Sequence, residues 1–377
     1  MYTPSAKSLS SLIGLFVISI VLMLIVENSR VFKEEENYES KLNAAKQMKK
    51  AELAIKEFRD NQGFVYDELN DPNKTGLIGE QNTVITTDRG DVDEKLTSLN
   101  PNFAAIIIDY FKELELKEGD EVAVSLTGSN PALNIAVYSA IYTMKLKPVI
   151  ITSLGSSMFG ANDPEFTWLD MERVLNEKGV FDYKSIAASL GGGRDIGRGL
   201  NRHGRFLLAS AIERNNVEFI KEKSLTASIE KKSSLFDIKN HAYKAYINIG
   251  GGLSSIGTSV NAKLLKPGIN KFVKFNNLKV KGTLFHFGDS DIPVLHLFDI
   301  KAIADRYQIP SAPDVVPEPG EGTMFKTERY NLVTASISLA ILSIMILVVI
   351  VFDRKQMKLR ESEVNRIKDK SMVASVH

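Results

Sequence analysis

Residues 247–257 read INIGGGLSSIG, which predicts a buried strand that ends in three glycines and leads into a helix of small residues. Similar passages occur earlier in the chain, at 126–134 (LTGSNPALN) and at 152–165 (TSLGSSMFGANDPE). In each of them a strand-like apolar run ends in small polar residues. Repeated strand–turn–helix units of this kind are typical of a mostly parallel α/β sheet.

The rest of the central region shows the same alternation. Further strands are expected in the runs AYINIGGG, KGTLFHFG and PVLHLFD. Helices are expected at 131–144, at 181–190, at 205–215, at 298–307, and after a cap at Asp163 with Pro164 in the first turn. We therefore predict a Rossmann-like, mostly parallel α/β domain over residues 61–308.

Two apolar runs stand near the ends of the sequence. Residues 9–26 and 332–352 contain no charged residue, and each is close to the ~20 apolar residues needed to cross a bilayer. The residues after the first run, VENSRVFKEEE, lack the small-residue pattern of a signal-peptide cleavage site. We therefore expect two transmembrane helices in contact with membrane lipids, the first of them an uncleaved anchor.

The charges that flank these runs predict an orientation. Basic residues are more numerous after the second run than before it: Arg354, Lys355, Lys358 and Arg360 against Lys326 and Arg329. Positive charge beside an apolar span favours the cytoplasmic side. The prediction is a two-pass protein of the cytoplasmic (inner) membrane, with cytoplasmic segments at 1–8 and 353–377 and an extracytoplasmic main domain.

The segments between the apolar runs and the central domain differ from each other in composition. Apolar residues recur every three or four positions from 38 to 58, which predicts an amphipathic helix within 33–60. Residues 309–331 begin with the proline- and glycine-rich run IPSAPDVVPEPGEG, which predicts an extended, hydrated linker.

The three loops of small residues are the candidate binding site. In open α/β sheets, ligands bind at the carboxyl ends of the strands, in a crevice where the strand order reverses. We therefore expect the loops to line one crevice and to approach an anion through backbone N–H groups. The candidate ligand-binding residues are Thr127, Ser129, Asn130, Gly250, Gly251, Gly252, Ser254 and Ser255. For each loop, a tight turn followed by a capped helix is the alternative.

None of these loops is a nucleotide-binding motif. GGGLSSIG lacks the Lys-Ser/Thr pair of a P-loop, and its glycines do not follow the G-x-G-x-x-G spacing. We therefore expect no nucleotide cofactor.

Positive charge is concentrated in two stretches. In GGGRDIGRGLNRHGR, Arg194, Arg198 and Arg202 recur every four residues, so a helix here would align three guanidinium groups that suit carboxylates or phosphates. Residues 263–281 contain six lysines and no acid. A solvated face is the alternative for either stretch, but together they favour an anionic partner. The net charge of +1 excludes a globally basic nucleic-acid binder.

Residues with catalytic chemistry are few. His286, Asp289, Asp291 and His296 lie close together in HFGDSDIPVLH, either as metal ligands or as part of a turn between strands, and we favour the turn. The chain has no G-x-S-x-G or H-E-x-x-H motif and no cysteine. We therefore expect no metal site and assign no catalytic residue.

The passages LTGSNPALN, GANDPEFTWLDME and GGGRDIGRGL resemble the membrane-anchored poly-γ-glutamate system proteins, which accompany the bacterial machinery that makes and exports that capsular polymer. The resemblance covers most of the central domain and is densest from 120 to 257. It implies partners among the synthase and export subunits, and it brings no established catalytic residue.

Poly-γ-glutamate is a polyanion of carboxylates, which agrees with anion-suited loops and an arginine row. The leading hypothesis is therefore a non-enzymatic accessory protein whose outer domain binds the polymer or the synthase subunits. One alternative is an extracytoplasmic γ-glutamyl hydrolase or transferase that acts on the polymer. Another is a purely structural scaffold.

Overall fold

The computed structural model describes residues 9–374, and the chain divides into two compact units. One unit combines Met1–Glu34 with Lys326–His377, and the other is Glu35–Phe325. The expected cytoplasmic segment 1–8 and the last three residues of the expected tail 353–377 lie outside the described residues.

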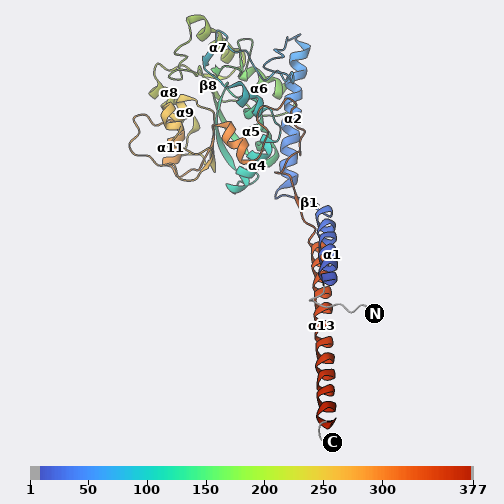
Figure 1. Cartoon of the computed structure of the whole chain (residues 1–377). Helices are drawn as coiled ribbons and strands as arrows, with labels where there is room; N and C mark the ends of the chain where they lie inside the picture. Colours follow the sequence, from blue (N-terminus) through green and yellow to red (C-terminus); the bar gives the residue numbers. More distant parts are fainter. Residues whose placement is uncertain (1–8, 375–377) are drawn as a thin grey trace. The chain divides into compact units, whose positions relative to one another are not determined.

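The first unit contains the two apolar helices. They are α1 (Leu9–Asn28) and α13 (Leu332–Ala374), and they lie side by side (Figure 1). Both contain stretches, Leu9–Asn28 and Leu332–Ile367, that are long and apolar enough to cross a membrane. Only 6% and 11% of their most apolar windows are buried, so neither is the core helix of a folded domain.

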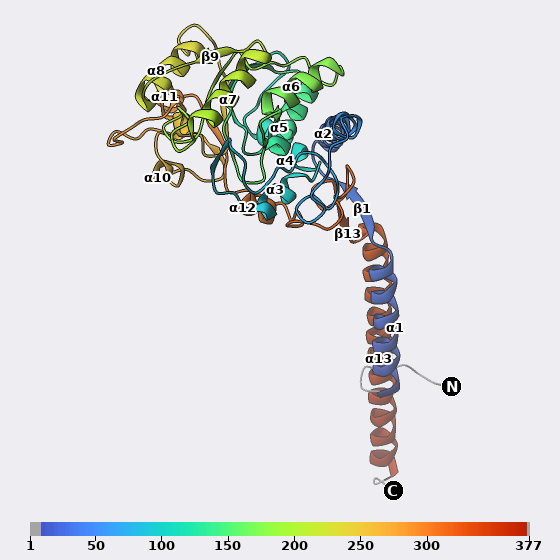
Figure 2. The same ribbon diagram turned by 90° about the horizontal axis from the view of Figure 1, so that it is seen from above.

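A short two-stranded ladder also belongs to this unit. Strand β1 (Val31–Glu34) pairs antiparallel with β13 (Lys326–Arg329), so that Val31 lies opposite Arg329 (Figure 2). The amphipathic helix expected within 33–60 is α2 (Tyr38–Asn61). It starts later than predicted, because residues 33 and 34 belong to β1.

The second unit is built on a seven-stranded sheet of order β11-β12-β10-β3-β4-β8-β9, in which only the edge strand β11 runs antiparallel. The strands are β3 (Glu121–Thr127), β4 (Lys147–Ser153), β8 (Ala187–Ser189), β9 (Glu218–Ile220), β10 (Ala245–Ile249), β11 (Gly268–Asn270) and β12 (Val294–Leu297). The expectation of a mostly parallel α/β sheet is confirmed.

The strand order reverses between β3 and β10. From β3 the chain adds β4, β8 and β9 in one direction, and it then returns to place β10 and β12 on the other side of β3. A crossover of this kind leaves a crevice at the carboxyl ends of the two strands that flank the reversal. The topology therefore places the ends of β3 and β10 next to each other.

Helices cover both faces of this sheet (Figure 1). They are α3 (Val92–Ser98), α4 (Phe103–Glu113), α5 (Pro131–Met144), α6 (Trp168–Glu177), α7 (Arg202–Arg214), α8 (Leu225–Phe236), α9 (Leu253–Ile256), α10 (Ser259–Ala262), α11 (Thr283–Asp289) and α12 (Ile300–Arg306). Short strands β2 (Thr86–Asp88), β5 (Ser156–Ser157), β6 (Asn162–Asp163) and β7 (Phe166–Thr167) pair outside the main sheet.

The alternation of side chains along the strands divides the core in two. In β3, Val122, Val124 and Leu126 belong to a large cluster with α2, α4, α5 and α6, whereas Ala123 belongs to a second cluster with α8 and α11. In β10, Tyr246 likewise faces the second cluster. Period-two alternation thus gives each face of the sheet its own layer of helices.

Three of the predicted local structures are wrong. The cap at Asp163 is part of the β6–β7 hairpin, and the helix begins at Trp168 with Thr167 and Asp170 in a capping box. The helix expected at 181–190 contains strand β8, whose small residues Ala187–Ser189 lack the β-branched signal of a strand. The strand expected in KGTLFHFG is α11, because a short, fully apolar run does not distinguish a buried strand from a buried helix.

The expected linker at 309–331 is also wrong in part, because residues 309–325 pack on the second unit. Ile309, Met324 and Phe325 are buried. Asn102 donates from Nδ2 to the carbonyl oxygens of Glu318 and Glu321, both at 3.2 Å. Backbone groups that a proline-rich segment would otherwise expose to water are thus satisfied by one asparagine.

Candidate functional site

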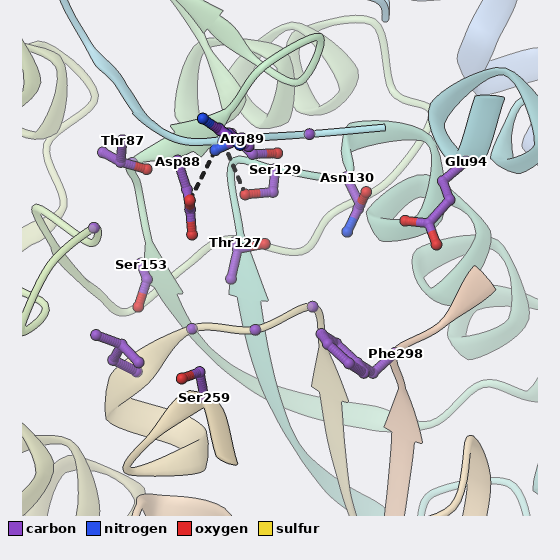
Figure 3. A pocket seen from close by; sticks show the side chains of 18 of the residues that line it. Thr87, Asp88, Arg89, Glu94, Thr127, Ser129, Asn130, Ser153, Ser259 and Phe298 are labelled. Carbon is purple, nitrogen blue, oxygen red and sulfur yellow. Dashed lines mark hydrogen bonds between the residues drawn. The ribbon is translucent and has the colours of Figure 1, made fainter. Parts of the chain in front are cut away.

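An open cavity of about 820 Å³ lies at the carboxyl ends of β3, β4 and β10, where the strand order reverses. All three loops expected to line one crevice contribute to its wall (Figure 3). They supply Thr127, Ser129, Asn130, Ser153, Gly155, Ser157, Gly250, Gly251 and Gly252. That part of the sequence prediction is confirmed.

The glycine loop after β10 packs directly on the end of β3. Gly250 has φ +76°, and a Cβ built on it would lie 2.9 Å from Thr127 Oγ1. A Cβ on Gly252 would lie 3.1 Å from Thr127 Cγ2 and 3.6 Å from Ser153 Oγ, whereas one on Gly251 would meet only the Phe298 ring at 3.4 Å. Glycine is therefore required at position 250 by both its backbone conformation and this close approach.

Thr127 has an uncommitted hydroxyl in this wall. The residue is 6% exposed, and its Oγ1 has no hydrogen-bond partner among the described residues. Leaving a buried hydroxyl unpaired costs about 1–3 kcal/mol. Its neighbours differ, because Ser129 Oγ accepts from the Ser157 N–H at 3.0 Å and Asn130 Oδ1 accepts from Lys95 Nζ at 2.6 Å. Among the three polar side chains predicted on this loop, Thr127 is the one whose buried oxygen has no partner in the described part of the protein.

The arginine row does not form as expected. Residues 191–200 are a series of turns, with positive φ at Gly191, Gly192, Arg194 and Asp195, so they are not helical. Five glycines in GGGRDIGRG favour turns over a helix. Arg194, Arg198 and Arg202 are all exposed, but only Arg198 lines the cavity.

Two further segments, for which no expectation was drawn from the sequence, complete the cavity wall. Thr87, Asp88, Arg89 and Gly90 come from the end of β2, and Phe298 and Asp299 follow β12. The β12 residues follow the same strand-end rule and could have been found by it. Strand β2 is three residues long and lies outside the main sheet, so no sequence pattern placed it here.

The cavity wall has mixed charge. Its cations are Arg89, Arg198 and Lys95, and its acids are Asp88, Asp91, Glu94 and Asp299. Asp91 is already paired with Lys301 at 2.7 Å. Three of the acids, Asp91, Glu94 and Asp299, belong to the α3 and α12 side of the wall, whereas Arg198 comes from the turns at 191–200. An anionic group is therefore better suited to the part of the cavity near Arg198 than to the part near these three acids.

Lys95 braces the loop after β3. Its Nζ donates to the Ser129 carbonyl oxygen and to Asn130 Oδ1, both at 2.6 Å. Burial lowers the pKa of this amine to about 8, while Glu94 and Asp91 act in the opposite direction. The pKa of Glu94 is raised, chiefly by burial. Lys95 thus fixes the loop after β3 through two hydrogen bonds from one buried amine.

A buried polar cluster lies behind Ser153. Lys232 Nζ donates to Ser153 Oγ at 2.8 Å and to Ser254 Oγ at 2.7 Å, and it forms an ion pair with Asp195 Oδ2 at 3.0 Å. Ser153 Oγ donates to Asp195 Oδ1 at 2.7 Å, and the Ser228 hydroxyl donates to Asp195 Oδ2. No sequence pattern points to Lys232 and Asp195 as a pair, because a single lysine in an ordinary helix has no recognisable signature.

Ser254 and Ser255, two of the candidate ligand-binding residues, are buried and do not line the cavity. Ser254 Oγ belongs to the buried cluster, and Ser255 Oγ lies 2.8 Å from Tyr246 Oη. Both hydroxyls are therefore occupied inside the protein.

The histidine-containing segment divides between two environments. His286 Nδ1 lies 2.8 Å from Ser233 Oγ on α8, and His296 Nδ1 lies 2.9 Å from Asn248 Nδ2 in the sheet. Burial lowers the pKa of His296 to about 4. Over residues 9–374, no group of three or more His, Cys, Asp or Glu side chains is arranged to hold a metal ion.

The fold and the cavity thus define a mixed α/β unit with a polar cleft at the reversal of strand order, in a chain with two helices apolar enough to cross a membrane. Comparison with protein-family models, with curated proteins and with solved structures finds no match for this chain.

Proposed function

We propose that the chain is a membrane-anchored accessory component of poly-γ-glutamate synthesis or export, and that its cleft binds a segment of the anionic polymer. The observation that carries the proposal is the convergence of three small-residue loops on one open cavity, with the unpaired Thr127 hydroxyl in its wall. Uncommitted hydroxyl and N–H donors suit a chain of carboxylates and peptide carbonyls.

The charges of the cavity wall restrict where the carboxylates of the polymer can bind. A carboxylate of the chain contacts Arg198 and Thr127 beside the glycine loop, and the acidic side near α3 and α12 stays clear of carboxylates. The sheet is a Rossmann-like, doubly wound one, so the polymer occupies the same crevice that nucleotides use in such sheets.

The proposal includes an orientation. Arg354, Lys355, Lys358 and Arg360 follow the second apolar run, which favours a cytoplasmic C-terminus and an extracytoplasmic α/β unit. On that side of the cytoplasmic membrane the cleft meets the polymer as it leaves the synthase and export subunits. Nucleotides are scarce there, which agrees with the missing P-loop lysine.

The test is a binding measurement on the full-length chain in lipid nanodiscs, with fluorescently labelled poly-γ-glutamate at a series of salt concentrations. We expect an affinity that falls as salt rises, because exposed charges are screened over about 8 Å at physiological ionic strength. The Arg198→Gln variant is expected to bind about 3- to 10-fold more weakly, which corresponds to roughly 0.7–1.4 kcal/mol.

Arg202→Gln is the matched control, because Arg202 is equally exposed but does not line the cavity. Equal losses in the two variants would indicate diffuse electrostatic attraction and would remove the cleft from the proposal. The absence of any salt-sensitive binding would leave only attachment to synthase subunits or a structural scaffold.

A further inference from the structure

We propose that Ser153 is a nucleophile for acyl transfer on an amide-linked anionic chain, with Lys232 as its general base. The proposal rests on the polymer occupying the cleft, and it adds a covalent step to that binding. It is carried by the contacts of the buried cluster and by the place of one of its hydroxyls in the cavity wall.

Ser153 is the one member of the cluster that lines the cavity, with 3% of the residue exposed. It ends strand β4 and lines the cavity, whereas Lys232, Asp195, Ser228 and Ser254 do not. Figure 3 shows its side chain in the wall, close to the glycine loop. A nucleophile requires both access to the substrate and a base within hydrogen-bond reach. Ser153 has the first by position and the second from Lys232 Nζ at 2.8 Å.

A purely structural role accounts poorly for the composition of the cluster. Lys232 and Asp195 are 1% and 2% exposed, and burying an ion pair costs free energy that well-packed apolar residues would not cost. Two serine hydroxyls also converge on one amine, at 2.8 and 2.7 Å, and lie 3.3 Å from each other. Serine and lysine in this relation form one of the recurrent variants of the serine nucleophile–base arrangement.

The electrostatics allow Lys232 to act as a base. Burial lowers the pKa of its amine, and the opposing effect of Asp195 is smaller. The amine that remains when Lys232 loses its proton lies 2.8 Å from Ser153 Oγ, within reach of the hydroxyl proton. Ser254 holds that amine in place through its own hydrogen bond, so it is a positioning residue.

The reaction balances without any further reagent except water. In the structure the Ser153 hydroxyl donates to Asp195 Oδ1, so the step begins when Lys232 is a neutral amine and the hydroxyl turns from Asp195 to Nζ. Ser153 Oγ then bonds to the carbonyl carbon while its proton moves to Lys232 Nζ. The carbon–nitrogen bond then breaks, and the same proton moves to the departing amine. Water next adds to the serine ester and gives one proton to Nζ, which returns it to Ser153 Oγ as the carbon–oxygen bond breaks. The sum is an amide and water converted to a carboxylic acid and an amine.

Donors for the negative oxygen of the intermediate are available beside Ser153. The glycine loop runs past its hydroxyl, since a Cβ on Gly252 would lie 3.6 Å from Ser153 Oγ. Among the described residues, the N–H groups of Gly251 and Gly252 donate to no protein acceptor. Backbone donors placed where charge develops are the usual means of stabilising such an intermediate.

The test is covalent labelling of the full-length chain in nanodiscs with a fluorophosphonate probe, read by intact mass and peptide mapping. The wild type is expected to gain one adduct at Ser153. Ser153→Ala is expected to lose it, with labelling and cleavage of poly-γ-glutamate at least ~100-fold slower. Labelling is also expected to rise with pH as Lys232 loses its proton.

Ser259→Ala is the matched control, because Ser259 is an exposed serine of the same cavity wall and lies outside the buried cluster around Lys232. It is expected to keep the adduct and the pH profile. No adduct on Ser153 of a chain that binds the polymer would overturn the inference and leave the proposed function intact. An adduct on a chain that binds no polymer would support the nucleophile and contradict the proposed function.

Discussion

The cavity wall and the buried cluster behind it use the same residue types in opposite ways. In the wall, Thr127 keeps a hydroxyl without a partner, and the glycine loop exposes its backbone. In the cluster, Ser228, Lys232 and Asp195 are buried and every one of them is hydrogen-bonded. A hydroxyl at the end of a parallel strand is available to a ligand when no protein group forms a hydrogen bond with it. A hydroxyl that is already hydrogen-bonded inside the protein stabilises the fold instead.

Ser153 belongs to both regions. It lies in the cavity wall, yet its hydroxyl accepts from Lys232 and donates to Asp195. Any ligand that contacts Ser153 therefore also contacts, through one hydrogen bond, the charged pair that joins β4, α8 and the turns at 191–200. An ordinary surface groove has no such hydrogen-bonded connection to a buried ion pair, so the cleft differs from one in this respect.

The largest expected effect on stability comes from removing one partner of the buried ion pair between Lys232 and Asp195. Lys232→Met leaves Asp195 buried without its cation, so the free energy of unfolding is expected to fall by about 3–5 kcal/mol. Urea denaturation followed by the fluorescence of Trp168, the single tryptophan and a fully buried one, measures the change. Lys231→Met is the control, because its pair with Glu218 is solvent-exposed and contributes at most about 1 kcal/mol. Similar losses in the two variants would mean that the buried pair is not structural.

The next effect concerns a buried carboxyl group, Glu52, that has an unpaired oxygen. Glu52 on α2 is buried with Oε1 unpaired, and burial raises its pKa to about 8, with Glu318 adding to the shift and Lys49 opposing it. The folded protein thus keeps this proton up to a higher pH than the unfolded chain. Stability is therefore full below the unfolded pKa near 4.5 and falls as pH rises towards 8, by up to about 1.4 kcal/mol per pH unit from this group.

Glu52→Gln is expected to remove that slope and to make the protein more stable than wild type at pH 8. Denaturation midpoints between pH 5 and pH 9 measure it. Glu57→Gln on the same helix is the control, because Glu57 is exposed beside Lys178 and the variant should keep the slope. An unchanged slope in Glu52→Gln would show that Glu52 is ionised in the folded protein at neutral pH.

The smallest effect on stability is expected at the unpaired hydroxyl. Thr127→Val replaces an unsatisfied Oγ1 with a methyl group, so the free energy of unfolding should stay constant or rise by up to about 1 kcal/mol. Thr152→Val, one strand away, removes a hydroxyl that lies 2.9 Å from Ser185 Oγ and should cost about 1 kcal/mol. If Thr127→Val also binds poly-γ-glutamate as tightly as wild type, the free hydroxyl has no part in ligand contact.

Much of the architecture follows from local sequence patterns. The uncharged runs at 9–26 and 332–352 are unambiguous because of their length. The strands before Gly128 and Gly250 are equally clear, because a strand buried on both faces of a parallel sheet needs a continuous run of apolar residues. The predicted secondary structure was wrong where the hydrophobic pattern was short or was mixed with glycine. Ala187–Ser189 has no strand signal, the run Thr283–Asp289 is too short to reveal its period, and the glycines at 191–199 override the spacing of the arginines.

The sequence by itself determined the parallel α/β sheet, its three small-residue strand ends and the two apolar helices. The tertiary structure alone decided that the Thr127 hydroxyl has no partner in the described part of the chain, and that Arg198 is the residue of the predicted arginine row that lines the cavity. It alone also brought Lys232 to Asp195 and two serines from distant elements. The physical reason is the distance along the sequence over which each feature is determined. Strands and helices arise from periodicity among neighbouring residues, whereas the pairing of a buried polar group depends on elements that only the folded chain brings within about 3 Å of each other.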